Sequence, residues 1–505
     1  MNLQGFFVRL VNQPRIAFLV PIKHKSVPKK ILGQGTVYLM AAEVVFMGSG
    51  YVMHFAVGRW LGPGLYGIFG LVLYLTVMLR AAFLEGIPKA VSKYTAEDNS
   101  NANAIKKEAI RIQIVLSTFI FVIFFSLSGT IASMLNDPRL APHLRLSAFM
   151  IPLYSLYLVF TGTLSGLRRF RTLSLTYTIY ALARMGLVLV LIFLGFSVGG
   201  AVLGLVLAAF VGMLVAYNCC RSGVTSSRFR RSKLIGFGTP IIVYSVAVFL
   251  LLDVDLLFVK GLLSENVLVG LYTSAKTLAR VPYFVFAALS TSLFPSIARS
   301  FSMNDIDLTK KYINQSLRYT LIISFPIAFI VSGTADSLIE TVYSASFAGA
   351  GPSLSILIFA LSFFSGFMIL STIIMGIGHP GISTILAAVM LLVNVFLNFI
   401  LIPRYQLLGG ALAASVSFLL GLALAAAYVY AKFHTLVNPS SLLRIFVASA
   451  IVYIISIKFS IPGIPLFGQY ICLFALYLVL LLFLREIRKE DIGVARGIFT
   501  GLLGQ

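Results

Sequence analysis

Ionisable side chains inside long apolar segments are the residues of this chain best suited to do chemistry. Arg184, Lys276, Arg280 and Glu43 each lie well within a segment that is otherwise apolar. A charge is unfavourable there unless it faces water or a partner, so these positions are expected to line a wet cavity. Three of the four are cations, and a guanidinium can hold a phosphate or pyrophosphate through two parallel hydrogen bonds. We therefore predict that these four residues bind an anionic substrate.

A second group of polar residues has the chemistry of a cation site. Asp253 and Asp255 lie near the end of one apolar segment, and Asn394 and Asn398 share a helix face because four residues separate them. Carboxylate and amide oxygens suit a hard cation, which makes these four residues candidates for ion coupling. Two other interpretations stay open. Nearby cations could neutralise the carboxylates as a structural pair, and the amides could join neighbouring helices through hydrogen bonds.

The remaining reactive side chains follow no pattern of an enzyme. Arg80 and Glu85 lie near the inner end of a segment, where we expect them to reach toward the cytoplasmic interface; a role in substrate binding is the alternative. The five histidines have no metal-ligand spacing, and the three cysteines imply no disulfide framework. The sequence contains no P-loop, serine-hydrolase or zinc-protease motif. We therefore expect neither catalysis nor a cofactor.

The elements that position these residues are predicted to be membrane-spanning helices. The chain has 505 residues, of which 59% are hydrophobic and only 11% charged, against about 25% charged in soluble domains. Its apolar segments are about twenty residues long, which matches a hydrocarbon core of ~30 Å, and helices satisfy every backbone amide there. The sequence thus predicts an all-α polytopic membrane protein with about fourteen transmembrane helices, at 34–57, 65–87, 112–133, 146–167, 172–195, 199–219, 234–259, 267–298, 314–335, 352–376, 381–402, 408–430, 442–460 and 465–484.

The net charge of +23 at first suggests nucleic acid, but the positions of the basic residues indicate membrane topology instead. With the N-terminus inside, 29 Lys and Arg residues fall at the cytoplasmic side and 6 at the other side. This asymmetry follows the positive-inside rule and predicts that both termini are cytoplasmic. Attraction to anionic membrane lipids is expected from the same charge, and nucleic acid is not expected as a partner.

An internal repeat divides the chain. Gly166 and Gly200 recur as Gly376 and Gly410 at an offset of 210 residues, and Gly67 recurs as Gly270 at an offset of 203. Parallel repeats of six helices are a transporter architecture, with the binding site at their interface. We predict a tail (1–33), a first six-helix bundle (34–219), a linker (220–233), a second six-helix bundle (234–430), helices thirteen and fourteen (431–484) and a C-terminal tail (485–505).

Three motifs resemble those of one transporter family. The first, Gly58-Arg59-Trp60-Leu61-Gly62-Pro63-Gly64-Leu65-Tyr66-Gly67-Ile68-Phe69, is similar to a loop of polysaccharide flippases. The second runs from Asp255 through Val269-Gly270-Leu271-Tyr272 to Leu293-Phe294-Pro295, and the third from Asn394 through Asn398 and Pro403-Arg404-Tyr405 to Gly409-Gly410-Ala411. Together they resemble the lipid-linked oligosaccharide flippases of the multidrug/oligosaccharidyl-lipid/polysaccharide exporter superfamily.

The resemblance implies two six-helix bundles plus two helices, and export of a polyprenyl-pyrophosphate-linked oligosaccharide by alternating access in the plasma membrane. Its implied partners are that lipid-linked glycan and, as a further expectation, a glycan polymerase or glycosyltransferases; we expect a monomer. One alternative is a cation-coupled multidrug exporter of the same superfamily, whose cavity should favour carboxylates and aromatic rings. Another is a membrane-embedded glycosyltransferase or ligase.

Overall fold

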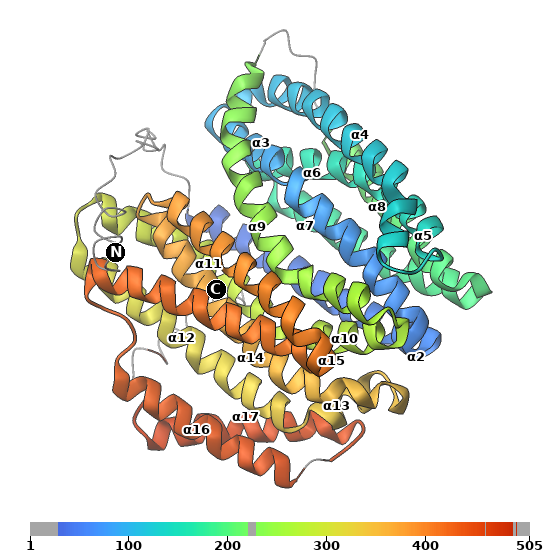
Figure 1. Ribbon diagram of the computed structural model, residues 1–505. Coiled ribbons are helices and arrows are strands. Elements are labelled where there is room, and N and C mark those ends of the chain that lie inside the picture. The colour runs from blue at the N-terminus through green and yellow to red at the C-terminus, as the bar shows by residue number, and fades with distance from the viewer. Residues whose placement is uncertain (1–28, 221–228, 460, 488–490, 492–505) are drawn as a thin grey trace.

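The computed structural model of the chain describes residues 29–220, 229–459, 461–487 and 491, and these are almost entirely helical (Figure 1). The tails before residue 29 and after residue 491, and most of the predicted linker, lie outside the described residues. The first part of the chain forms seven α-helices and two short helical turns. They are α2 (Lys29–Leu84), α3 (Gly86–Glu97), η1 (Asn99–Asn101), α4 (Ala102–Met134), α5 (Leu140–Ala148), α6 (Met150–Gly166), α7 (Phe170–Leu191), η2 (Ile192–Phe196) and α8 (Ser197–Cys219).

The second part of the chain forms a similar set of helices followed by two more. They are α9 (Arg231–Leu263), α10 (Asn266–Ala279), α11 (Val281–Ser302), α12 (Ile306–Gly333), α13 (Ala335–Val342), η3 (Ala345–Ala350), α14 (Gly351–Gly376), α15 (Pro380–Phe433), α16 (Pro439–Lys458) and α17 (Pro465–Phe483). Proline in the first turn of α15, α16 and α17 suits a helix start, because its missing N–H has no partner there. Helix α9 packs on α2 and α3 as well as on α15, so it joins the two sets.

Ten helical stretches among the described residues are long and apolar enough to cross a membrane, which confirms the predicted polytopic helical class. Three of the ten change direction at an internal residue with positive φ: Gly62 (φ 71°), Gly195 (φ 89°) and Gln406 (φ 49°). Each of these residues lies at or between the ends of two predicted segments. The predicted segment 267–298 consists of α10 and α11, which meet at Arg280. The number fourteen remains a prediction.

The helices α2 and α10 cross where the repeat predicts equivalent residues. Both glycines at the closest point are required, because a Cβ atom on Gly67 would lie 2.8 Å from the backbone nitrogen of Gly270. Residues related by one sequence offset meet only close to the axis that relates two repeats. Three pairs with the offset of 203 residues are in contact: Gly67 with Gly270, Gly70 with Thr273, and Tyr74 with Thr277 (hydroxyl oxygens 3.4 Å apart). The packing at this crossing supports the predicted pair of parallel bundles.

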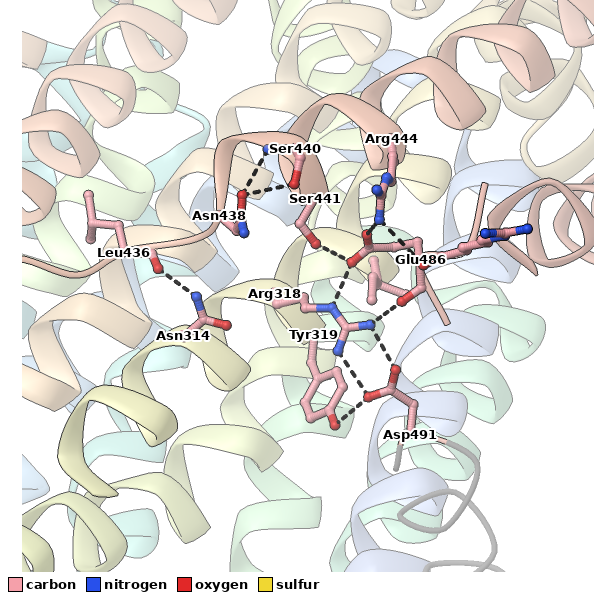
Figure 2. A network of polar contacts seen from close by, with 12 residues as sticks. Asn314, Arg318, Tyr319, Leu436, Asn438, Ser440, Ser441, Arg444, Glu486 and Asp491 are labelled. Carbon is pink, nitrogen blue, oxygen red and sulfur yellow. Dashed lines mark hydrogen bonds and ion pairs between the residues drawn. The ribbon is translucent and has the colours of Figure 1, made fainter. Parts of the chain in front are cut away.

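Helices α16 and α17 lie along α12 at the edge of the molecule (Figure 1). Figure 2 shows the polar network that fastens them there. Arg318 on α12 donates through Nε to Glu486 (2.7 Å) and holds Asp491 through two parallel bonds of 3.0 and 2.7 Å. The side chains of Arg318 and Glu486 are buried, and Ser441 on α16 also donates to Glu486. Glu486 therefore joins α12, α16 and the segment after α17, and Arg318 adds a second attachment of that segment to α12 through Asp491.

Candidate functional site

Four of the predicted site residues form one cluster of charges at the interface of the two bundles. Lys276 on α10 contacts Asp255 and lies 3.4 Å from Asp253, both on α9. Arg280 contacts Asp253 through its terminal nitrogen. Asp255 also accepts hydrogen bonds from the Tyr272 hydroxyl (2.7 Å) and from the Leu256 backbone (2.8 Å). The cluster is buried and holds two carboxylates with two cations, so its charges balance.

Arg280 differs from the other members because it keeps part of its surface free. It lies at the junction of α10 and α11, and its side chain is 20% exposed, whereas Lys276 is 1% exposed. Its guanidinium carbon lies 4.7 Å from the ring centroid of Tyr74 on α2, so the cation faces the first bundle. Its Nε has no hydrogen-bond partner among the described residues. A partly exposed guanidinium at this interface can donate further hydrogen bonds to an anionic oxygen.

Arg184 on α7 lies in the first bundle rather than in the charge cluster. Its guanidinium stacks 4.4 Å above the ring of Phe46 and donates to the Phe46 carbonyl oxygen over 3.1 Å. A Cβ atom on Gly50 would lie 2.8 Å from the guanidinium, so this glycine makes room for the cation. The Nε atom of Arg184 has no hydrogen-bond partner in the described part of the chain. Like Arg280, it therefore retains a free donor.

Glu43 lines a cavity of about 380 Å³ between α2, α3, α6 and α7. Glu85 lies on the same cavity and forms an ion pair of 3.1 Å with Lys89, while Glu43 has no ion-pair partner among the described residues. Phe46 belongs to the cavity wall, so Arg184 lies next to the cavity through its contact with that ring. Arg80, which we expected to extend to the interface, instead stacks 3.6 Å above the ring of Tyr154, another wall residue.

Asn394 and Asn398 on α15 are buried and pair with each other, with 2.8 Å between the Asn398 and Asn394 amides. Among the described residues, no hydrogen bond connects either amide to Asp253 or Asp255. One atom of each amide stays without a partner: Nδ2 of Asn394 and Oδ1 of Asn398. The four residues predicted for ion coupling therefore lie in two separate groups, and in the carboxylate group the cations are Lys276 and Arg280.

A further cluster, which the sequence did not reveal, connects the two bundles at the predicted outer end. Lys260 of α9 is fully buried and donates to Asp137 (3.2 Å), to the side chain of Asn266 (2.6 Å) and to the backbone oxygen of Ser264 (3.2 Å). Asp137 precedes α5 and also accepts from Asn266 over 2.6 Å. We call Asp137, Lys260 and Asn266 the outer-end cluster. Burial raises the pKa of Asp137, but the hydrogen bonds from Asn266 and Lys260 outweigh it and lower that pKa.

The structure thus divides the predicted substrate residues between two places. Lys276 and Arg280 lie together at the bundle interface, and Arg184 and Glu43 lie around the cavity of the first bundle. Sequence reasoning missed the outer-end cluster and the Arg318 network, because the members of each lie on segments far apart in the sequence. The one available signal was the position of Lys260, a cation on the side of the membrane that otherwise carries few.

Comparisons with known proteins agree with this architecture. The chain is 26% identical to Stage V sporulation protein B of Bacillus subtilis, over 92% of this chain and 97% of that protein. It is 20% identical to a Shigella flexneri protein named for O-antigen transport, over 72% of this chain and 89% of that one. Its fold resembles the lipid II flippase MurJ in an inward closed conformation, with a TM-score of 0.74 and 16% identity over 90% of this chain and 99% of that one.

A second solved structure has the same general fold. An inward-facing multidrug resistance MATE family transporter matches with a TM-score of 0.64 and 16% identity, over 81% of this chain and all of that one. At such low identities these structures establish the fold alone. The sequence profile of a family described as polysaccharide biosynthesis protein matches residues 32–301. Because this match covers more than half of the chain, the protein belongs to that family of polysaccharide biosynthesis proteins.

Proposed function

We propose that the protein is a flippase that moves a polyprenyl-pyrophosphate-linked oligosaccharide across the plasma membrane by alternating access. Membership of the polysaccharide biosynthesis family and the likeness to a protein named for O-antigen transport support this function. The single observation that carries the mechanism is the position of Arg280. Its guanidinium lies where the two bundles meet, faces the first bundle and keeps one donor unpaired.

In this mechanism the negative charge of the pyrophosphate must be compensated in a medium of low dielectric constant. Arg280 and Arg184 each have a free Nε donor, and each belongs to a different bundle. A guanidinium stays protonated at depth and offers two parallel hydrogen bonds to phosphoryl oxygens. The substrate would bring phosphoryl acceptors to both arginines, and a compensating charge to Arg184, while the bundles change their relative position.

Export of the lipid-linked glycan by variants tests this proposal. In a strain that lacks the protein and has a glycan defect, Arg280→Ala should fail to complement, and Arg280→Lys should complement in part because it keeps the charge without the planar fork. Each variant must accumulate in the membrane like the wild type. Full complementation by well-expressed Arg280→Ala and Arg184→Ala would refute the role of these arginines.

A multidrug exporter is the second candidate, because the fold also resembles that of a multidrug resistance MATE family transporter. The two functions differ in a simple measurement. Deleting the protein should leave resistance to cationic dyes unchanged if it is a flippase, and should sensitise the cell to them if it exports drugs.

We also propose that both termini are cytoplasmic, in line with the distribution of Lys and Arg. Cysteines introduced as Ser26→Cys and Lys489→Cys should resist a membrane-impermeant maleimide in intact cells and react after the cells are opened. Reaction of either cysteine in intact cells would reverse the topology.

A further inference from the structure

The cavity of the first bundle has a wall of tyrosines that the pyrophosphate mechanism does not use. Tyr157 lies at the centre of this wall, with its ring centroid 5.2 Å from Tyr154, 5.2 Å from Tyr180 and 6.3 Å from Tyr177. All four tyrosines line the cavity. Tyr157 is only 1% exposed, and its buried hydroxyl has no hydrogen-bond partner in the described part of the chain. A buried donor without a partner is unfavourable unless a ligand or water completes it.

The rest of the cavity wall offers short polar side chains. Ser92 and Ser165 lie 3.1 Å apart through their hydroxyl oxygens, and Thr161 lies on the same surface. Glu43 contributes a carboxylate without an ion-pair partner among the described residues, and a carboxylate accepts strong hydrogen bonds from hydroxyl groups. The cavity therefore combines flat aromatic faces with acceptors and hydroxyls.

The charges around the cavity argue against a site for organic cations. The cavity holds two carboxylates, Glu43 and Glu85, but Lys89 already pairs with Glu85. Arg80 stacks on the wall residue Tyr154, and Arg184 stacks on the wall residue Phe46. Three cations thus surround two carboxylates, so a cationic ligand would meet net repulsion. A neutral ligand with many hydroxyl groups meets no such repulsion, and its hydroxyls can donate hydrogen bonds to Glu43.

We propose that this cavity binds a pyranose unit of the glycan, separately from the arginine at the bundle interface that meets the pyrophosphate. The apolar C–H face of a pyranose packs on a tyrosine ring, while its hydroxyls reach Glu43 and the serine and threonine hydroxyls. The volume of about 380 Å³ lies at the low end of small-molecule sites, which span ~300–1,000 Å³, so the cavity takes a short part of the glycan. This inference rests on the proposed flippase function and adds the residues that would select the sugar.

The test is saturation-transfer NMR on the purified full-length protein with three kinds of probe. Methyl glycosides of glucose, galactose and N-acetylglucosamine represent the sugar, geranylgeranyl pyrophosphate represents the carrier without sugar, and tetraphenylphosphonium represents an organic cation. We expect at least one glycoside to receive saturation at its ring protons. Tyr177→Ala should weaken that binding about tenfold, in keeping with the loss of one ring contact, whereas Tyr177→Phe should keep most of it.

The same experiment separates the two proposals. Arg280→Ala should weaken geranylgeranyl pyrophosphate binding and leave the glycoside signal, and Tyr177→Ala should do the reverse. If the wild type binds the pyrophosphate and complements export but no glycoside is saturated, the sugar site is wrong and the flippase function stands. If tetraphenylphosphonium binds and Glu43→Gln abolishes that binding, the cavity is a site for organic cations instead. If the protein neither complements nor binds the pyrophosphate, the proposed function itself fails.

Discussion

The substitution Lys260→Met should open the predicted outer end of the molecule. The Lys260 ammonium has three hydrogens, and each finds an acceptor: Asp137 at 3.2 Å, Asn266 at 2.6 Å and the Ser264 backbone oxygen at 3.2 Å. Methionine fills a similar volume but donates no hydrogen bond. The contact of Lys260 with Asp137 links α9 to the segment before α5, so it exists only while the two bundles are closed at that end.

The free-energy cost of Lys260→Met follows from the burial of the ion pair between Lys260 and Asp137. Breaking a buried ion pair by removing one partner destabilises a structure by ~3–5 kcal/mol. Asp137 keeps its bond from Asn266 and an ion pair with Arg139, so we expect the low end of that range, about 3 kcal/mol. Because each 1.4 kcal/mol is a factor of ten, the ratio of closed to open outer ends should fall about a hundredfold.

A cysteine placed between the bundles reports this ratio. Thr273 is fully buried at the crossing of α2 and α10, so Thr273→Cys in a chain without the three native cysteines reacts only when that crossing opens. With a membrane-impermeant maleimide outside the cell, Lys260→Met should raise the labelling rate by up to about a hundredfold. Arg139→Gln is the matched control, because Arg139 also pairs with Asp137 but is 79% exposed and lies in the same bundle; it should change the rate little.

Two outcomes would contradict this reasoning. An unchanged labelling rate in a well-folded Lys260→Met variant would show that the outer-end cluster does not hold the bundles together. An equal increase in Arg139→Gln would show that any change near Asp137 has the effect. If Lys260→Met does not accumulate, the double variant with Asp137→Asn removes both charges, should restore abundance, and should still label rapidly.

The same cluster predicts a dependence on external pH. The folded structure lowers the pKa of Asp137, so the stabilisation is complete above the ordinary aspartate pKa of about 3.9 and is lost as the pH falls through the lowered value. Labelling of Thr273→Cys, divided by the rate for a freely exposed cysteine at the same pH, should therefore stay low near neutral pH and rise only in strongly acidic medium.

Three other substitutions test the packing. Arg318→Met should lower the abundance of the protein and reduce its stability by ~3–5 kcal/mol, because the buried Glu486 and the partly buried Asp491 lose their shared partner. Arg444→Gln removes only an exposed partner of Glu486 and should change stability by less than ~1 kcal/mol; equal losses in a thermal unfolding assay would argue against the network. Gln406→Gly should raise the midpoint of thermal unfolding by relieving a positive φ of 49°, worth ~1 kcal/mol, and no gain would show that the chain tolerates this conformation without strain. Asp255→Asn should leave Lys276 with Asp253 as its only carboxylate partner among the described residues, and should reduce both abundance and transport; normal transport would exclude a structural and an ion-coupling role alike.

The repeat shows how far sequence reasoning extends into the three-dimensional structure. An offset of 203 residues relates Gly67 to Gly270 in the sequence, and these two glycines meet at the crossing of α2 and α10. The sequence also predicted the change of direction inside α15, because Gln406 lies between the predicted segments 381–402 and 408–430. Such features depend on local sequence, and a repeat shares its backbone geometry between its two copies.

The partners of the charged residues could not be predicted from the sequence. Hydrophobic length, the spacing of glycines and the distribution of Lys and Arg determined that this protein is a polytopic helical membrane protein with an internal repeat, because the lipid imposes those constraints on each segment separately. Only the packing of helices decided that Arg280 and Lys276 bind Asp253 and Asp255 and that Arg184 stacks on Phe46, whereas the spacing of four residues already placed Asn394 and Asn398 on one face. The contacts of the charged residues join different helices. Each depends on how the helices are rotated about their axes, and tertiary packing, which no single segment encodes, sets that rotation.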